Sequence, residues 1–101
     1  MSSPAELSEL TLERFLPLVA QEFRLHAGDT ELGALLVEAR AVGQALPDRR
    51  QAFSLIFAAP ASPVLPQCIY RVEHVSVGAL DVFLVPVGLK DSRVEYQAVF
   101  N

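Results

Sequence analysis

A cysteine and a histidine stand close enough in this sequence to suggest a nucleophile and its base. Cys68 and His74 lie in the segment from Cys68 to Val75, whose alternating apolar and polar residues are typical of a β-strand. On one extended strand they would share a face but lie about 20 Å apart, at ~3.3 Å per residue. A thiolate and its base must come within about 3 Å of each other. The spacing therefore predicts a small buried or strand-edge cysteine and no dyad.

The two histidines do not form a metal motif. His26 and His74 are far apart in the sequence, Cys68 is the single cysteine, and no cluster has the ligand spacing of a zinc site. A long-range site formed by His26, His74 and Asp81 has no support from the spacing. Glycine-rich phosphate loops and nucleophile elbows are also absent from the sequence. We therefore expect no catalytic residues, no metal and no cofactor, and a protein that is not an enzyme.

Charged residues recur on the polar side of the alternating segments. The favoured interpretation is that they form cross-strand pairs on a solvated sheet face. The other interpretation is a ligand groove lined by Arg71, Glu73 and Glu95. The charged residues are Glu22, Arg24, Glu38, Arg40, Arg71, Glu73, Asp81 and Glu95.

The two tyrosines are in phase with the apolar positions of their segments. We therefore expect Tyr70 and Tyr96 to be core aromatics whose hydroxyl groups reach the rim. A second interpretation groups them with His74 as a small-molecule groove at the mouth of a barrel.

Six segments in which side chains alternate with a period of two carry these residues. Their connections are short, and short connections join antiparallel neighbours. The sequence therefore predicts a mainly β fold, either a small six-stranded antiparallel barrel or two packed sheets.

Turn residues lie at Gly88 to Ser92, and three prolines predict a stiff loop at residues 59–66. Helical spacing also fits part of residues 31–42, so strand and helix both stay open there. The segments are residues 19–26, 31–42, 51–58, 68–75, 80–87 and 94–100, with inward positions at Phe53, Leu55, Phe57, Tyr70, Val72, Leu80, Val82, Leu84, Tyr96, Ala98 and Phe100.

One short helix is expected before the strands, at about residues 11–17, where it would act as a lid on the sheet. Thr11 fits the N-cap position, and Pro17 interrupts the helix because it lacks an N–H group. Residues 1–10 are expected to form a frayed lead-in. The helical stripe consists of Leu12, Phe15, Leu16 and Val19.

Length and composition limit the class of protein. The 101 residues are 51% hydrophobic and 20% charged, which suits a single β-rich domain over residues 1–101. A net charge of −4 disfavours nucleic acid, and the adjacent cations Arg49 and Arg50 are interpreted as a solvated turn. The first residues lack a signal-peptide pattern, and no apolar run approaches the ~20 residues of a membrane helix. We expect a cytoplasmic protein that binds neither nucleic acid nor membranes.

One predicted strand is apolar on both faces. Val82 and Leu84 alternate with Phe83, Val85 and Val87. Such a strand is either covered on both sides or meets a partner with one face. We predict an interface with a protein partner or a second copy at Phe83, Val85 and Val87. The alternative, that Phe83 lies beneath the helix or the proline loop, stays open.

Several stretches together resemble one family of short bacterial proteins of uncharacterised function. They are Phe53–Pro60 (FSLIFAAP), Leu65–His74 (LPQCIYRVEH), Phe83–Val87 (FLVPV) and Tyr96–Asn101 (YQAVFN), so the resemblance covers nearly the whole chain. Cys68 stands where the family has a turn glycine after Pro-Gln. Such proteins accompany phage-tail-collar-like proteins, so the resemblance implies a role beside a tail-like assembly. It supplies no catalytic residues.

Two functions follow from these observations. The favoured one is a non-enzymatic interaction or assembly domain, accessory to a phage-tail-like structure. The alternative is a small-molecule-binding β-barrel or small enzyme with a site at the barrel mouth. A flat apolar patch would favour the first function, whereas a deep pocket with polar groups near Tyr70, His74 and Tyr96 would favour the second.

Overall fold

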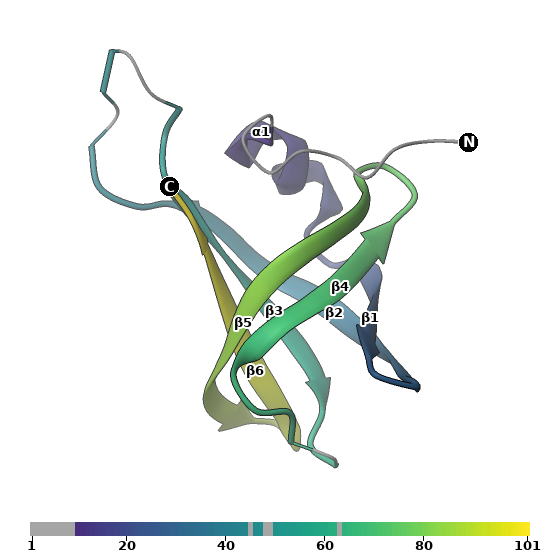
Figure 1. Cartoon of the computed structure of the whole chain (residues 1–101). Helices are drawn as coiled ribbons and strands as arrows, with labels where there is room; N and C mark the ends of the chain where they lie inside the picture. The colour runs from purple at the N-terminus through teal and green to yellow at the C-terminus, as the bar shows by residue number, and fades with distance from the viewer. Residues whose placement is uncertain (1–9, 45, 48–49, 63) are drawn as a thin grey trace.

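Six antiparallel strands form a closed barrel (Figure 1). The computed structural model describes residues 10–44, 46–47, 50–62 and 64–101. Around the barrel the strands follow the order β1-β2-β3-β6-β5-β4, and every neighbouring pair is antiparallel. The predicted six-stranded antiparallel fold is confirmed, and it is a barrel rather than two packed sheets. The strands are β1 (Glu22–Ala27), β2 (Thr30–Ala41), β3 (Phe53–Pro60), β4 (Cys68–His74), β5 (Gly78–Lys90) and β6 (Arg93–Phe100).

Residues 31–42, for which the sequence allows either a strand or a helix, belong to strand β2 up to Ala41. Ala34 and Leu36 are buried inside the barrel, and a bulge at Val37 shifts the register with β3. Because a bulge adds one residue to one strand, the next inward position is Ala39, three residues after Leu36. Inward spacings of two and three residues in one strand imitate the spacing of a helix, which explains the ambiguous pattern.

The turn between β5 and β6 is tighter than the sequence predicts. The expected turn residues begin at Gly88, but Gly88 lies within β5, and the turn consists of Asp91 and Ser92. Both have positive φ, 52° and 65°, as in the two-residue hairpin turns whose twist matches that of the flanking strands. A second bulge, at Val87, lengthens β5 and carries Gly88 into the ladder.

A short helix packs at one end of the barrel (Figure 1). Phe15 and Leu18 are buried, whereas Leu16 and Val19 are 49% and 36% exposed, so the second half of the predicted stripe is wrong. The cause is Pro17, near which the helix tightens to about three residues per turn, so that Leu18 follows Phe15 at the inward position. The elements are α1 (Leu12–Phe15) and a 3-10 turn, η2 (Leu16–Leu18).

Side chains fill the barrel interior. Every residue predicted to point inward is buried, with exposed fractions of 8% or less. Near the helix, the rings of Phe53 and Phe100 stack with centroids 4.7 Å apart, and Phe15 packs against both. Phe23 meets Phe57 edge to face at 5.2 Å. Aromatic side chains bury the largest areas, so these contacts supply much of the apolar stabilisation.

Arg50 is a structural residue and not part of a solvated turn. Its guanidinium group donates hydrogen bonds to the backbone oxygens of Leu10 (2.6 Å) and Asn101 (2.8 and 3.0 Å), and it lies over two buried phenylalanine rings. Leu10 is fully buried, so this last residue of the expected lead-in is not frayed. The remaining lead-in, residues 1–9, and Arg49 lie outside the described residues.

Candidate functional site

The outer wall of β4 and β5 carries two exposed apolar side chains. Ile69 on β4 and Phe83 on β5 face each other in register, and they are 64% and 52% exposed. Directly opposed residues on antiparallel strands have Cβ atoms about 4.5–5.5 Å apart, so the two side chains form one surface. We call this surface the apolar patch. Since half of its side chain is exposed, Phe83 is not buried beneath the helix or the proline loop.

The other predicted interface residues continue along the outside of β5. Val87 is 50% exposed at the bulge, and Val85 is half-buried opposite Gln97 of β6. Sequence reasoning misses Ile69. The signal is nevertheless present, because Ile69 alternates with Tyr70, which points inward, and this phase places Ile69 on the outer wall.

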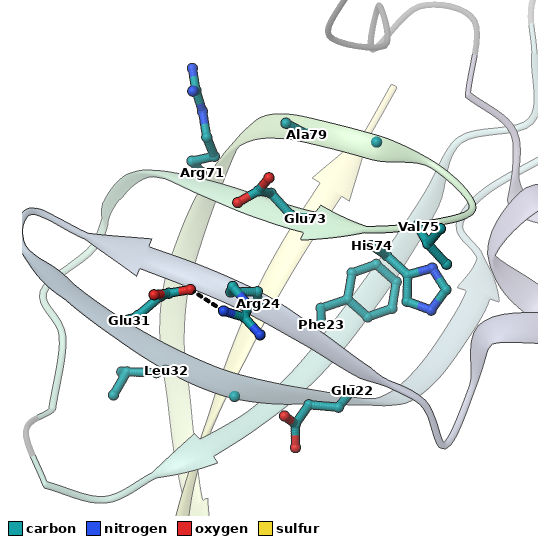
Figure 2. A pocket seen from close by; sticks show the side chains of 12 residues that line it. Glu22, Phe23, Arg24, Glu31, Leu32, Arg71, Glu73, His74, Val75 and Ala79 are labelled. Carbon is teal, nitrogen blue, oxygen red and sulfur yellow. Dashed lines mark hydrogen bonds and ion pairs between the residues drawn. The ribbon is translucent and has the colours of Figure 1, made fainter. Parts of the chain in front are cut away.

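Next to the apolar patch, the outer wall is charged. Two ion pairs and one histidine–carboxylate contact cross three strand boundaries, from β5 through β4 and β1 to β2, and we call this set the charged row. Figure 2 shows the Arg24–Glu31 pair, with Arg71 and Glu73 on the neighbouring strand. The hydrogen bond from Arg24 lowers the pKa of the Glu31 carboxyl group and raises that of Arg24 itself. The favoured interpretation, cross-strand pairing on a solvated face, therefore holds for these residues. The pairs are Arg71–Asp81 (3.3 Å from Nε to Oδ1), His26–Glu73 and Arg24–Glu31.

An open groove of about 970 Å³ runs along the charged row. Gly33 lies on its wall, and the carboxylate of Glu22 comes within 2.7 Å of the position that a Cβ atom would occupy there. Of the predicted ligand-groove residues, Arg71 and Glu73 line this groove, whereas Glu95 lies on β6 outside it. Because most charges on the wall already face an opposite charge, the groove presents a mixed surface and not a field of one sign.

His74 is held in place by three contacts. Its Nδ1 accepts a hydrogen bond from the backbone N–H of Ser76 (3.0 Å), and its Nε2 lies 2.8 Å from Oε1 of Gln21. These partners fit a neutral imidazole with its proton on Nε2. The ring packs against Phe23 with centroids 4.7 Å apart (Figure 2). His26 belongs to the charged row, and no group of three potential metal ligands is present among the residues that the structure describes.

Tyr70 and Tyr96 belong to the inner wall. Tyr70 donates a hydrogen bond to the carbonyl of Pro66 (2.5 Å), and the Tyr96 hydroxyl accepts one from the backbone N–H of Leu65 (2.9 Å). The two hydroxyl groups therefore tie the proline-containing loop to one end of the barrel, and burial raises the pKa of Tyr70. His74 is at the opposite end of β4, so the structure does not bring the three residues of the alternative ligand groove together.

Cys68 and His74 are kept apart by the strand that carries them. Cys68 is the first residue of β4 and His74 is the last. Cys68 is exposed and forms no disulfide within the described part of the chain. The geometry therefore leaves the thiol without a histidine base.

The chain belongs to a family described as a domain of unknown function, DUF6916, whose model matches residues 10–100. The matched span contains the helix and all six strands described above. It confirms the expected membership of a small domain family of uncharacterised function. No match was found among curated proteins or solved structures. Over residues 10–44, 46–47, 50–62 and 64–101, no helix is long and apolar enough to cross a membrane.

Proposed function

We propose that this member of the DUF6916 family is a non-enzymatic interaction domain that binds a protein partner through the apolar patch. The observation that carries the proposal is the direct pairing of Ile69 with Phe83 at 64% and 52% exposure. Two large apolar side chains directly opposite each other on neighbouring strands form one apolar surface, and burying such a surface against a partner is favourable. Val87, exposed further along β5, extends the apolar surface in the strand direction.

The filled interior of the barrel supports the same proposal. Barrels that bind small molecules inside keep a cavity at the mouth or centre. Here aromatic side chains occupy the helix end, and the hydroxyl groups of Tyr70 and Tyr96 are already bonded to the loop at the other end. The features available to a partner therefore lie on the outer wall.

The finer proposal is an accessory role in a phage-tail-like assembly in the cytoplasm. Its support is the resemblance of the FLVPV and YQAVFN stretches to short bacterial proteins that accompany phage-tail-collar-like proteins. The FLVPV stretch begins at Phe83, so the apolar patch lies in one of these stretches. The unpaired thiol of Cys68 suits a reducing compartment.

The test is capture of partner proteins from a lysate of the native host by immobilised wild type and by Ile69→Asp and Phe83→Asp. Val75→Asp is the matched control, because Val75 is 97% exposed in the turn after β4 and receives the same charge away from the patch. We expect both patch variants to stay folded by circular dichroism and to lose one protein that wild type and Val75→Asp retain. Equal capture by every variant would contradict the proposal.

A second candidate function, small-molecule binding or a small enzyme activity, is favoured by the groove along the charged row. The groove brings Arg24, Glu73 and His74 to one open surface, where a zwitterionic ligand would meet both signs of charge. Its lining extends from the charged side chains of β1, β2 and β4 to the β4–β5 turn at Val75 and Gly78. An NMR titration with amino acids and other zwitterionic metabolites tests it. Shifts confined to the groove, absent in Arg24→Ala, would support binding there.

A further inference from the structure

Within the part of the chain that the structure describes, the first half of β5 has a strand neighbour on one side only. Gly78 to Leu84 pair with β4 along their whole length, but the ladder between β5 and β6 begins at Val85 opposite Gln97. No turn, loop or cap hydrogen bond of the described main chain involves residues 79–84. Among the described residues, this stretch therefore has a strand edge whose outward-directed backbone donors and acceptors have no backbone partner.

β6 does not pair with this part of β5, because the end of β6 pairs with β3 alone. Phe100 is paired with Phe53 of β3, so the end of β6 stays with β3 while β5 diverges towards its hairpin with β4. Figure 1 shows β5 and β6 separating from the β5–β6 turn towards the C-terminus. An exposed strand edge is a template for pairing with another strand, and proteins that keep one either protect it or use it.

We propose that a second copy of this chain pairs with this edge, so that β5 of two molecules forms an antiparallel ladder across a two-fold axis. An antiparallel edge is complementary to itself, so one free edge is enough to build a closed dimer. Asp81 is the single charged residue from Gly78 to Leu84, and it already contacts Arg71 at 3.3 Å. The contact therefore concentrates little charge, although each chain carries a net charge of −4.

Side-chain direction and charge select the register. Outward residues must face outward residues, since the outer walls of both barrels continue into each other. A two-fold axis at Asp81 gives the longest overlap but sets two carboxylates directly opposite, which is destabilising. An axis at Val82 avoids this. It places Asp81 opposite Phe83 of the partner subunit and Leu80 opposite Leu84 of the partner subunit.

This register makes a charge-specific prediction at Phe83. Phe83→Asp places a second carboxylate opposite Asp81 of the partner subunit, twice per dimer, and should weaken the dimer on the order of tenfold or more. Phe83→Lys places a cation there and should keep the dissociation constant within a few-fold of wild type. Ile69→Asp is the control, because Ile69 is on β4, one strand away from the edge. It should leave the dimer unchanged.

Sedimentation equilibrium of the full chain, from micromolar to millimolar concentration, measures these constants. Amide hydrogen exchange provides a second measurement, because exchange at residues 79–84 should slow as the dimer forms. A protein that stays monomeric throughout overturns the proposal. So does a dimer that Phe83→Asp and Phe83→Lys weaken equally, or that leaves exchange at residues 79–84 unchanged. The proposed partner binding is judged separately, since Ile69→Asp should abolish that binding but not the dimer.

Discussion

Val82 and Phe83 are consecutive residues of β5, yet 6% of the first side chain is exposed and 52% of the second. Val82 belongs to the inner wall, where each apolar side chain is covered by others from the surrounding strands. Phe83 belongs to the outer wall, where its described strand partner Ile69 is even more exposed, at 64%. One strand therefore serves two purposes, because side chains alternate between the two faces. The inner wall stabilises the barrel, and the outer wall is available for recognition.

The outer wall is itself divided. Two residues along β4 from Ile69, Arg71 is already paired with Asp81 on β5. The charged row thus satisfies its own interactions within the chain, whereas the apolar patch does not. This difference favours the apolar patch over the charged row as the surface that a partner covers.

The largest expected effect compares the same substitution on the two walls. Phe57 is 2% exposed and packs against Phe23, so Phe57→Ala should lower the free energy of unfolding by roughly 3–5 kcal/mol. Phe83→Ala should lower it by about 1 kcal/mol or less, since half of that side chain is already in water. Urea unfolding of both variants measures the difference. Equal losses would remove the distinction between the walls.

A smaller effect is expected from a hydroxyl group on the inner wall. Tyr96→Phe leaves the backbone N–H of buried Leu65 without its acceptor, which should cost about 1–3 kcal/mol. Tyr70→Phe removes only a donor to the Pro66 carbonyl, which lies at an exposed residue and can bind water instead. Its cost should be the lower of the two. Thermal unfolding of the two variants tests this order, and the reverse order would contradict the assigned roles.

The charged row should respond weakly to acid. The hydrogen bond from Arg24 lowers the pKa of Glu31 in the folded protein below its ordinary value of 4.5. The folded state therefore binds this proton less readily than the unfolded state, so the contribution is present above pH 4.5 and is lost as the pH falls through the folded pKa. Melting temperatures of wild type and Glu31→Gln should differ slightly at neutral pH and converge in acid. A gap that widens in acid would contradict this sign.

The smallest effect is expected at Cys68. Its side chain is exposed at the start of β4 and has no histidine base, so Cys68→Ala should change the free energy of unfolding by about 0.5 kcal/mol or less. Partner binding or any activity found should stay within a few-fold of wild type. Loss of partner binding or of activity in a folded Cys68→Ala protein would show that the thiol takes part in function, which would contradict this prediction.

The inner wall could be predicted from the sequence because one rule governs it. Strict alternation in β3 and β6 marks Phe57 and Tyr96 as inward without knowledge of their neighbours. The bulges at Val37 and Val87 break that rule, and their positions depend on the partner strand. Contacts between distant segments are equally invisible, such as Arg50 with backbone 40 and 51 positions away. Alternation also places Ile69 on the outer wall of β4, but its position opposite Phe83 depends on the register between two strands, which the sequence does not show.

The contacts of Arg50 also suggest that the strands could be connected in a different order along the chain without changing the barrel. One guanidinium group holds the backbone at Leu10 and at Asn101, so these two positions are neighbours in space. A short linker could join them, and the chain could then be opened at the tight turn of Asp91 and Ser92. Such a circular permutant would keep every strand pair except the direct hairpin connection between β5 and β6. Folding of such a permutant, measured by circular dichroism, would show that strand pairing, and not the order of the strands along the chain, specifies the barrel.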